Sequence, residues 1–385
     1  MACQIGAGLS RAVSAAAAGI EAAQEARAGL AGAEVDLAFL FLSSAHLDDA
    51  VAAADAVRDE LAPRHLLGCV AEGVLAHDSE LEEGPGAAVW AGSLPGAELE
   101  CFHAVAVGTD EGVAVAGFPE LEDPGLVALL VDPFSFPAVP FLERLNEERP
   151  GLPLVGGIAA GGGQPGRQAL ILGDEVVEEG AVGAVISGVP VLTVVSQGCA
   201  PIGREAVITR AEGNVVYELA GEPALDRLRA ELMALSPEQR RLAARGILAG
   251  LVIDENKAEY GRGDYLMRGL LGADESSGAL AVGASVRVGQ TLRFHVRDAD
   301  SADEDLREAL DAGVGRAKAA GALVFTCNGR GTNMFPEPSH DARVVSEALR
   351  SRAVAGFFCG GEIGPVGGRA FLHGFTATLA VFLEP

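Results

Sequence analysis

Two short segments near the C-terminus combine a thiol, other polar groups and glycines directly after an apolar run. The first reads LVFTCNGRG over residues 323–331, and the second reads GFFCGGEIGP over residues 356–365. A guanidinium can bind a carboxylate through two hydrogen bonds, a carboxylate can neutralise an amine, and a thiol becomes a nucleophile once it is ionised. The side chains that could do this chemistry are Cys327, Asn328, Arg330, Cys359 and Glu362.

The elements that must position these side chains occur three times along the chain. Continuous apolar runs bounded by glycine are typical of buried strands, and ligands of open α/β sheets bind beyond the carboxyl ends of such strands. The pattern of strand, helix, strand and glycine-rich turn also covers residues 36–73 and residues 126–161. In the first of these copies Ser43 follows one strand, and Cys69 and Glu72 come with the other. The three copies hold glycines in comparable places, namely Gly68, Gly156 and Gly356.

Repetition of one crossover unit predicts related lobes that face each other, each with its helix packed on a sheet through a right-handed connection. We therefore expect an α/β fold with mixed sheets, built from repeated strand–helix–strand units in two related domains. The expected divisions are a leading helix in residues 1–34 that starts at Ser10, a first domain in residues 35–220 and a second in residues 221–385. We also expect the glycine-bearing tips of the three copies to converge on one cavity near Arg330.

Several motifs in a fixed order resemble the FIST domain, a sensory module named for F-box and intracellular signal transduction proteins. They are Gly8-Leu9-Ser10, residues 67–73, residues 196–203, residues 265–272, Gly289-Gln290 with Arg297-Asp298, residues 327–331 and residues 361–365. The chain is similar to both the N-terminal and the C-terminal FIST parts over nearly its whole length. The resemblance implies sensing of a small ligand, usually suggested to be an amino acid or a derivative, and no established reaction. Val70 and Ala71 stand where many members carry Ser and Thr, so contacts through those hydroxyls are not carried over.

The predicted function is an intracellular sensor that binds a small, amino-acid-like polar metabolite and passes its bound state to a separate effector protein. Arginine would hold a ligand carboxylate, glutamate a ligand amine, and the other polar groups would add hydrogen bonds. Each residue also has a simpler explanation: an arginine can pair with an acidic neighbour, a glutamate can cap a helix, and a cysteine can be a small buried hydrophobe. The predicted ligand-binding residues are Ser43, Cys69, Glu72, Gln197, Arg268, Cys327, Asn328, Arg330, Cys359 and Glu362.

Two other functions also fit the sequence. One is a thiol-dependent enzyme that uses Cys327 or Cys359, and the other is a scaffold for protein interactions. We predict no metal and no cofactor. The seven histidines lack the H-x-x-x-H and H-E-x-x-H spacings of zinc sites. The GGGQPG sequence at residues 161–166 matches a dinucleotide fingerprint but precedes a strand-like segment where a helix is required.

Composition narrows the classes of partner and compartment. The chain of 385 residues is 49% hydrophobic, which indicates a globular protein with a large core. Its net charge of −26 and its lack of a basic stretch argue against nucleic acid and membrane surfaces as partners. Six scattered cysteines without a Cys-x-x-Cys motif indicate a reducing, cytoplasmic setting. Residues 180–203 carry no charge, but Pro190 and several glycines favour two strands joined by a turn over a membrane span.

Overall fold

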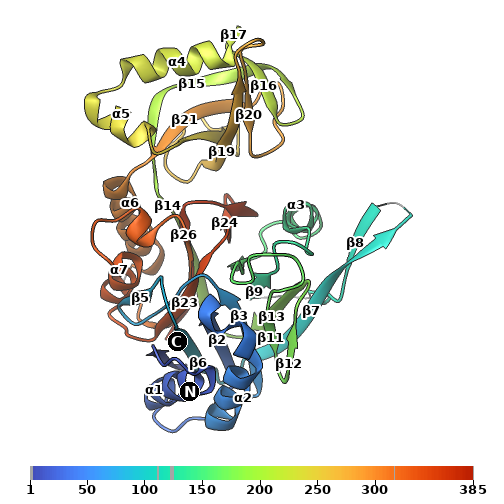
Figure 1. Cartoon of the computed structure of the whole chain (residues 1–385), viewed down its shortest axis with the longest axis vertical. Coiled ribbons are helices and arrows are strands. Elements are labelled where there is room, and N and C mark those ends of the chain that lie inside the picture. The colour runs from blue at the N-terminus through green and yellow to red at the C-terminus, as the bar shows by residue number, and fades with distance from the viewer. Residues whose placement is uncertain (1–2, 111, 122–124, 316, 385) are drawn as a thin grey trace. The chain divides into compact units, whose positions relative to one another are not determined.

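The computed structural model describes residues 3–110, 112–121, 125–315 and 317–384, and it divides the chain into two compact units (Figure 1). Unit 1 consists of Met1–Val195, Leu306–Leu372 and Thr376–Pro385. Unit 2 consists of Ser196–Asp305 and His373–Phe375. Each unit is thus assembled from segments that are separated in sequence. The predicted division into residues 1–34, 35–220 and 221–385 describes domains that are continuous in sequence, which is a different kind of division from these units. It stays a prediction.

All three predicted strand–helix–strand copies are present, and all three belong to unit 1. The two strands of each copy pair in parallel with each other, and the strands beside them in the sheet run antiparallel. The sheets are therefore mixed, which confirms the predicted α/β fold. The copies are β2 (Leu37–Ser43), α2 (Ala50–Leu61) and β3 (His65–Ala71); β9 (Leu126–Val131), α3 (Ala138–Glu148) and β10 (Leu154–Ile158); and β22 (Ala319–Cys327), α7 (His340–Leu349) and β23 (Val354–Cys359).

The glycines of the three copies lie in the middle of the second strand and not at its tip, contrary to the expectation from sequence. Each faces the residue at the centre of the first strand, which is Leu40, Leu129 or Val324. A Cβ atom on Gly68, Gly156 or Gly356 would come within 2.0, 1.9 or 1.7 Å of the carbonyl oxygen of that residue. Only glycine therefore lets the two backbones of each copy approach this closely.

Three sheets form unit 1. The first has the order β1-β6-β2-β3-β11-β12, the second β14-β26-β22-β23-β4-β5, and the third β25-β24-β10-β9-β13-β7-β8. Their remaining strands are β1 (Gln4–Ser10), β4 (Val74–Ala76), β5 (Ser79–Leu81), β6 (Ala87–Ser93), β7 (Glu98–Thr109), β8 (Gly112–Ala116), β11 (Leu170–Leu172), β12 (Glu175–Val177), β13 (Ala181–Ser187), β14 (Val191–Gln197), β24 (Glu362–Val366), β25 (Arg369–His373) and β26 (Thr376–Leu383).

Aromatic side chains fill the space between the sheets of unit 1. The ring centroids of Phe41 and Phe357 lie 5.2 Å apart, and those of Trp90 and Phe382 lie 4.9 Å apart. These four aromatic residues belong to one buried apolar cluster, which also contains side chains of β9 and β13 in the third sheet. This single core ties the three copies together, because burial of large apolar side chains is the main favourable term in folding.

The N-terminal segment contains a strand before its helix, where the sequence had indicated a helix from Ser10. Residues Gln4–Ser10 form β1, which pairs antiparallel with β6, and the helix α1 spans Ala15–Ala28. The Cβ of an alanine at Gly6 or Gly8 would lie 1.8 or 2.0 Å from a carbonyl oxygen of α1. The two glycines therefore serve close packing of β1 on the helix, which short-range sequence signals do not reveal.

Unit 2 is built on antiparallel strands with two of its helices made from residues 224–243. Helix α5 begins with a capping box between Ser236 and Gln239 and has Pro237 in its first turn, as the sequence predicts. The elements are β15 (Cys199–Glu212), β16 (Val215–Leu219), β17 (Glu222–Pro223), α4 (Ala224–Ala234), α5 (Pro237–Ala243), β18 (Ile247–Val252), β19 (Tyr265–Asp274), β20 (Ala279–Val282) and β21 (Thr291–Arg297), followed by α6 (Ala299–Val314), whose last residues belong to unit 1.

The uncharged stretch at residues 180–203 forms strands, as predicted. β13 and β14 lie on either side of a turn that contains Gly188 and Pro190. Across the part of the chain that the structure describes, no helix has the length and apolar character needed to cross a membrane.

The close backbone contact at Gly356 leads to a stability prediction. We expect Gly356→Ala to lower the free energy of unfolding by about 3 kcal/mol, because the new methyl group would overlap the carbonyl of Val324. Gly108→Ala is the matched control, since no atom lies within 4 Å of a Cβ there and the expected change is within about 0.5 kcal/mol. Urea denaturation followed by circular dichroism measures both. Equal effects of the two substitutions would contradict this account.

Candidate functional site

Main-chain hydrogen bonds join the carboxyl ends of strands from all three copies. Gly161, which follows β10, donates to the carbonyl of Val70 in β3 at 3.3 Å. Gly360, which follows β23, donates to the carbonyl of Ile158 in β10 at 2.9 Å. We call the residues at the carboxyl ends of β3, β10, β22 and β23 the strand-end junction. Carboxyl ends of parallel strands are the usual place for ligands in α/β sheets.

Arg330 lies in the strand-end junction and forms a buried ion pair with Asp341, the second residue of α7. Its Nε donates to Oδ2 at 2.7 Å and its Nη2 donates to Oδ1 at 2.8 Å, and both side chains are 0% exposed. Thr326 donates its hydroxyl to the same carboxylate at 2.6 Å. Burial opposes ionisation of Asp341, but the guanidinium and the hydrogen bonds hold its pKa below the ordinary value. The pair therefore ties the end of β22 to the start of α7.

An aromatic stack shields one side of this ion pair. The guanidinium of Arg330 lies over the ring of Phe335, with Cζ 5.2 Å from the centroid. The ring of His340 stacks on Phe335 at 3.5 Å, while its Nδ1 is 2.9 Å from Asp341 Oδ1. The guanidinium is thus engaged by a carboxylate and a ring in the interior of unit 1. From the sequence, Arg330 could either bind a ligand or pair with an acidic neighbour at the surface. The structure shows an acidic partner, Asp341, that is buried.

Two buried glutamates lie near the ion pair. Glu362 accepts hydrogen bonds from the amide of Thr376 at 3.1 Å and from its hydroxyl at 2.8 Å. Glu80 accepts one from the amide of Ala342 at 2.9 Å. Burial raises the pKa of each glutamate to about 8, and the charge of Asp341 adds to the shift at Glu80. Both carboxyl groups are therefore largely neutral at pH 7, which limits the charge buried beside Arg330.

Three predicted thiols come from neighbouring strands of the copies. Cys327 and Cys359 are register partners at the ends of β22 and β23, and Cys69 lies on β3. Burial raises the pKa of the Cys69 and Cys359 thiols well above the ordinary value, and nearby Glu362 adds to the shift at Cys359. A nucleophilic thiol must instead ionise near neutral pH. The surroundings of Cys359 therefore disfavour a nucleophilic role for this thiol.

The remaining predicted residues of unit 1 differ in exposure. The Ser43 hydroxyl is buried and accepts a hydrogen bond from the Gly86 amide at 2.9 Å, which is a structural role. Glu72 is exposed at the surface of the junction. Asn328 is half-buried, and its amide nitrogen on the main chain donates to the Cys359 carbonyl at 2.9 Å. Glu72 and Asn328 are thus the predicted junction residues that a ligand in solvent could reach.

Gln197 and Arg268 belong to unit 2, whereas the other eight predicted residues belong to unit 1. The Gln197 side chain donates to the carbonyl of Tyr265 at 2.8 Å, and its main-chain amide donates to Asp305 at 2.5 Å. Arg268 donates from Nη1 to the neighbouring carbonyl of Met267 at 2.9 Å. These contacts lie within unit 2 and connect its strands and loops.

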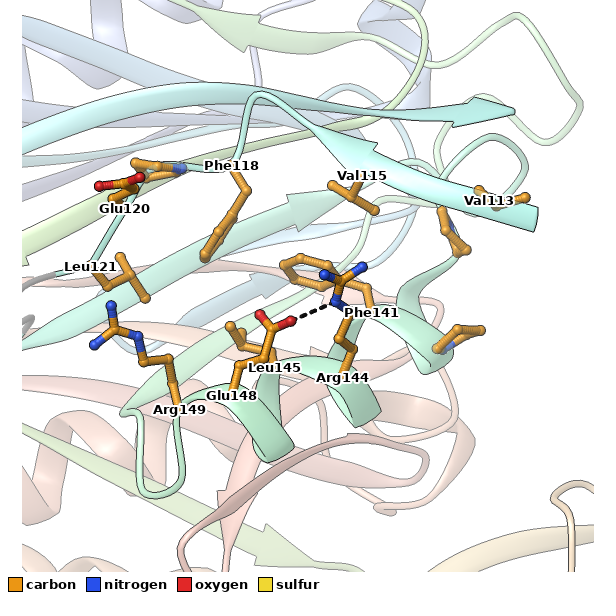
Figure 2. A pocket seen from close by; sticks show the side chains of 13 residues that line it. Val113, Val115, Phe118, Glu120, Leu121, Phe141, Arg144, Leu145, Glu148 and Arg149 are labelled. Atoms are coloured by element: carbon orange, nitrogen blue, oxygen red, sulfur yellow. Dashed lines mark hydrogen bonds and ion pairs between the residues drawn. The ribbon is translucent and has the colours of Figure 1, made fainter. Parts of the chain in front are cut away.

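A pocket of about 570 Å³ lies elsewhere in unit 1, between β8 with its following segment and α3 (Figure 2). None of the ten predicted residues lines it. Nine of its thirteen lining residues are apolar and four are charged, and Phe118 and Phe141 are in edge-to-face contact at 5.1 Å between ring centroids. The lining residues are Val113, Val115, Phe118, Pro119, Glu120, Leu121, Pro137, Pro140, Phe141, Arg144, Leu145, Glu148 and Arg149.

Charged side chains lie at the mouth of this pocket. Arg144 pairs with Glu148 at 2.7 Å, one turn further along α3. Glu120 and Arg149 lie at one end, on either side of Leu121, whereas Phe141 lies towards the other end (Figure 2). Opposite charges beside an apolar wall suit a ligand with an ammonium, a carboxylate and an apolar side chain.

No motif in the sequence indicates this pocket. Its apolar residues come from a hairpin strand and from the core-facing side of α3, and such residues are normally read as core. Glu120 and Arg149 look like ordinary surface charges in a chain with 54 acidic and 28 basic residues. Only the placement of α3 opposite β8 brings them together. Among the described residues, no group of His, Cys, Asp or Glu side chains could hold a metal ion.

The buried ion pair allows a mutational test. Arg330→Met leaves Asp341 buried without its charge partner, and we expect the free energy of unfolding to fall by about 3–5 kcal/mol. The matched control is Arg352→Met, which removes an exposed pair with Asp78 at 3.4 Å. Exposed pairs contribute little, so the control should resemble the parent in urea denaturation. A mild effect of Arg330→Met would show that the carboxylate of Asp341 is not confined as described.

The raised pKa of Glu362 predicts a pH dependence of stability. In the fold Glu362 stays neutral up to a pKa of about 8, whereas its ordinary value is 4.5. Its contribution to stability is therefore complete below about pH 4.5 and is lost as the pH rises through 8. Between these limits the loss is on the order of 1.4 kcal/mol per pH unit for one such group.

Glu362→Gln removes this ionisation and keeps an oxygen that can accept from Thr376. The variant should gain stability relative to the parent as the pH rises from 5 to about 8, in urea denaturation at a series of pH values. The control is Glu72→Gln at the exposed glutamate of the same junction. Parallel pH profiles of the parent and Glu362→Gln would refute the raised pKa.

Comparison with known proteins agrees with this architecture. The FIST N domain matches residues 36–222 and the FIST C domain matches residues 224–365. An uncharacterized protein of Mycobacterium tuberculosis is 44% identical over 384 residues, which cover 99% of this chain and 100% of that protein. An uncharacterized protein of Mycobacterium bovis is 42% identical over 384 residues, covering 99% of each chain. FIST domains are generally sensory domains of signal transduction. The chain belongs to the FIST family and contains both its N and its C domain.

Proposed function

We propose that this FIST protein is a cytoplasmic sensor that binds a small amino-acid-like metabolite in the pocket between β8 and α3. Its bound state would be read by a separate effector protein. The observation that carries the proposal is a pocket that combines apolar side chains with two opposite charges at one end, Glu120 and Arg149. A volume of about 570 Å³ falls within the range of small-molecule sites.

The chemistry of the lining favours an amino acid with a large apolar side chain. Arg149 can bind the α-carboxylate with a bidentate guanidinium, and Glu120 can accept from the α-ammonium group. The side chain would then lie against Phe118, Phe141 and Leu145. Arg144 and Glu148 form an ion pair at 2.7 Å and so neutralise each other. They therefore contribute little to the preference of the pocket for one ligand charge over another.

The strand-end junction is a second candidate location for the ligand. Glu72 and Asn328 are its solvent-accessible predicted residues, and they could contact an amine and a carboxylate. The engagement of Arg330 with Asp341 weighs against this location, because a ligand carboxylate would have to displace a buried carboxylate from two hydrogen bonds. The pocket is therefore our first choice, and the predicted residues of the junction remain the second.

Thermal-shift and calorimetric titration with four matched compounds tests the proposal. The compounds are L-phenylalanine, 3-phenylpropionate without the ammonium group, 2-phenylethylamine without the carboxylate, and L-serine without the apolar side chain. We expect L-phenylalanine to raise the melting temperature most, because a ligand that binds the native state stabilises it. Absence of any shift by L-phenylalanine at millimolar concentration would refute a site for apolar amino acids.

Two variants locate the binding site. Arg149→Gln should weaken L-phenylalanine binding by about tenfold or more, which corresponds to the loss of one charge-assisted contact. Arg11→Gln, at another exposed arginine of unit 1, should leave binding unchanged. If Asn328→Ala weakens binding and Arg149→Gln does not, the ligand occupies the strand-end junction and the pocket is not the site.

A further inference from the structure

The pocket between β8 and α3 follows the helix from one end to the other. Its lining residues on this wall begin at Pro137, directly before α3, and end at Arg149, directly after it. α3 has 11 residues, so its axis is about 16 Å long at the rise of 1.5 Å per residue of a helix. In Figure 2 Arg149 and Val113 lie at opposite ends of the pocket. The pocket is therefore elongated.

The two ends of the pocket differ in chemistry. Glu120 and Arg149 supply opposite charges at one end (Figure 2). At the other end the lining consists of Val113 in β8 and of two prolines at the start of α3, Pro137 and Pro140. A proline has no amide hydrogen to donate, and its ring is apolar. Val113 is 66% exposed, so its side chain is open to a ligand. This end of the pocket can contribute apolar contact and no charge.

The length of the pocket exceeds that of a phenylalanine side chain. The para carbon of the ring lies about 5 Å from Cα at ordinary bond lengths. With the ligand ammonium and carboxylate at Glu120 and Arg149, a single ring stops short of Val113. A second ring in the para position reaches about 4 Å further along the pocket. The longer side chain would remove more apolar surface from water, on the ligand and on the protein, which favours binding.

An ion pair between the two ends favours an aromatic substituent over an alkyl chain. Arg144 and Glu148 lie between Arg149 and Val113 in Figure 2, and their side chains are 2.7 Å apart. A guanidinium that is paired in its plane still presents a flat face, on which an aromatic ring can stack. An alkyl chain gains no such electrostatic contact. The middle of the pocket therefore suits a ring system that runs parallel to α3.

We propose that the ligand of this pocket, whose place there rests on the proposed function, is an α-amino acid with a side chain of two aromatic rings linked end to end. Its ammonium and carboxylate groups bind Glu120 and Arg149. The first ring lies against Phe118 and Leu145, and the second extends past Arg144 towards Val113. The pocket thus selects for the reach of the side chain as well as for its apolar character.

Two isomers of one compound test the selection by reach. In 4-phenyl-L-phenylalanine the second ring continues the line of the first, whereas in 2-phenyl-L-phenylalanine it points to the side. The isomers have the same atoms and nearly the same hydrophobicity. In isothermal titration calorimetry we expect the 4-phenyl isomer to bind about tenfold or more tighter than L-phenylalanine, and the 2-phenyl isomer to bind no tighter than L-phenylalanine.

A variant at the apolar end locates the second ring. Val113→Asp places a carboxylate where the ring would displace water, so we expect binding of the 4-phenyl isomer to weaken by about fivefold or more. Binding of L-phenylalanine should not change, which also shows that the variant is folded. The control is Val107→Asp, because Val107 is 43% exposed on the paired strand β7 and does not line the pocket.

The outcomes separate this proposal from the proposed function. If L-phenylalanine binds but the 4-phenyl isomer binds no tighter, the selection by reach is wrong and the amino-acid site stands. If the two isomers bind equally, or if Val113→Asp and Val107→Asp affect the 4-phenyl isomer equally, the second ring does not occupy the apolar end. If neither L-phenylalanine nor the 4-phenyl isomer binds at millimolar concentration, both proposals fail.

Discussion

A hydrogen atom in place of a side chain at the centre of each parallel strand pair is the constraint on which unit 1 depends. At Gly68, Gly156 and Gly356 the second strand approaches the carbonyl oxygen of the first so closely that no Cβ can be accommodated. The same contact in three copies sets a common geometry for each crossover unit. The carboxyl ends of the strands can therefore meet, and hydrogen bonds from Gly161 and Gly360 hold them together.

The strand-end junction follows from this geometry and has an electrostatic consequence. Strand ends that meet in the interior leave polar groups with little water, so each charge needs a partner or must be neutralised. Arg330 and Asp341 meet this requirement by pairing, whereas burial raises the pKa of Glu80 and Glu362 and so favours their neutral forms. Arg330 and Glu362, two of the polar residues that suggested a ligand site in the sequence, thus take part in balancing charge inside the junction.

The sequence predicted the repeated units well because their signal is local. Apolar runs, helical spacing and bounding glycines are sufficient to find β2, β9 and β22 and their partners. Three contacts between distant segments could not be predicted from the sequence. They are the close packing of β1 on α1 at Gly6 and Gly8, the ion pair of Arg330 with Asp341, and the position of α3 opposite β8. In each case the role of a residue depends on contact with an element that is distant in the sequence. Local sequence patterns do not show which distant elements will be in contact.

β8 supplies one wall of the pocket that we propose as the binding site, and this wall is supported differently from the opposite one. β8 is the last strand of its seven-stranded sheet, and its paired neighbour in that sheet is β7. The other wall is α3, whose Phe141 and Leu145 belong to a buried apolar cluster of unit 1. Segments with few buried contacts open most easily, so a ligand in the pocket would order β8 more than α3. β8 is therefore the wall through which occupancy of the pocket would alter the surface of unit 1.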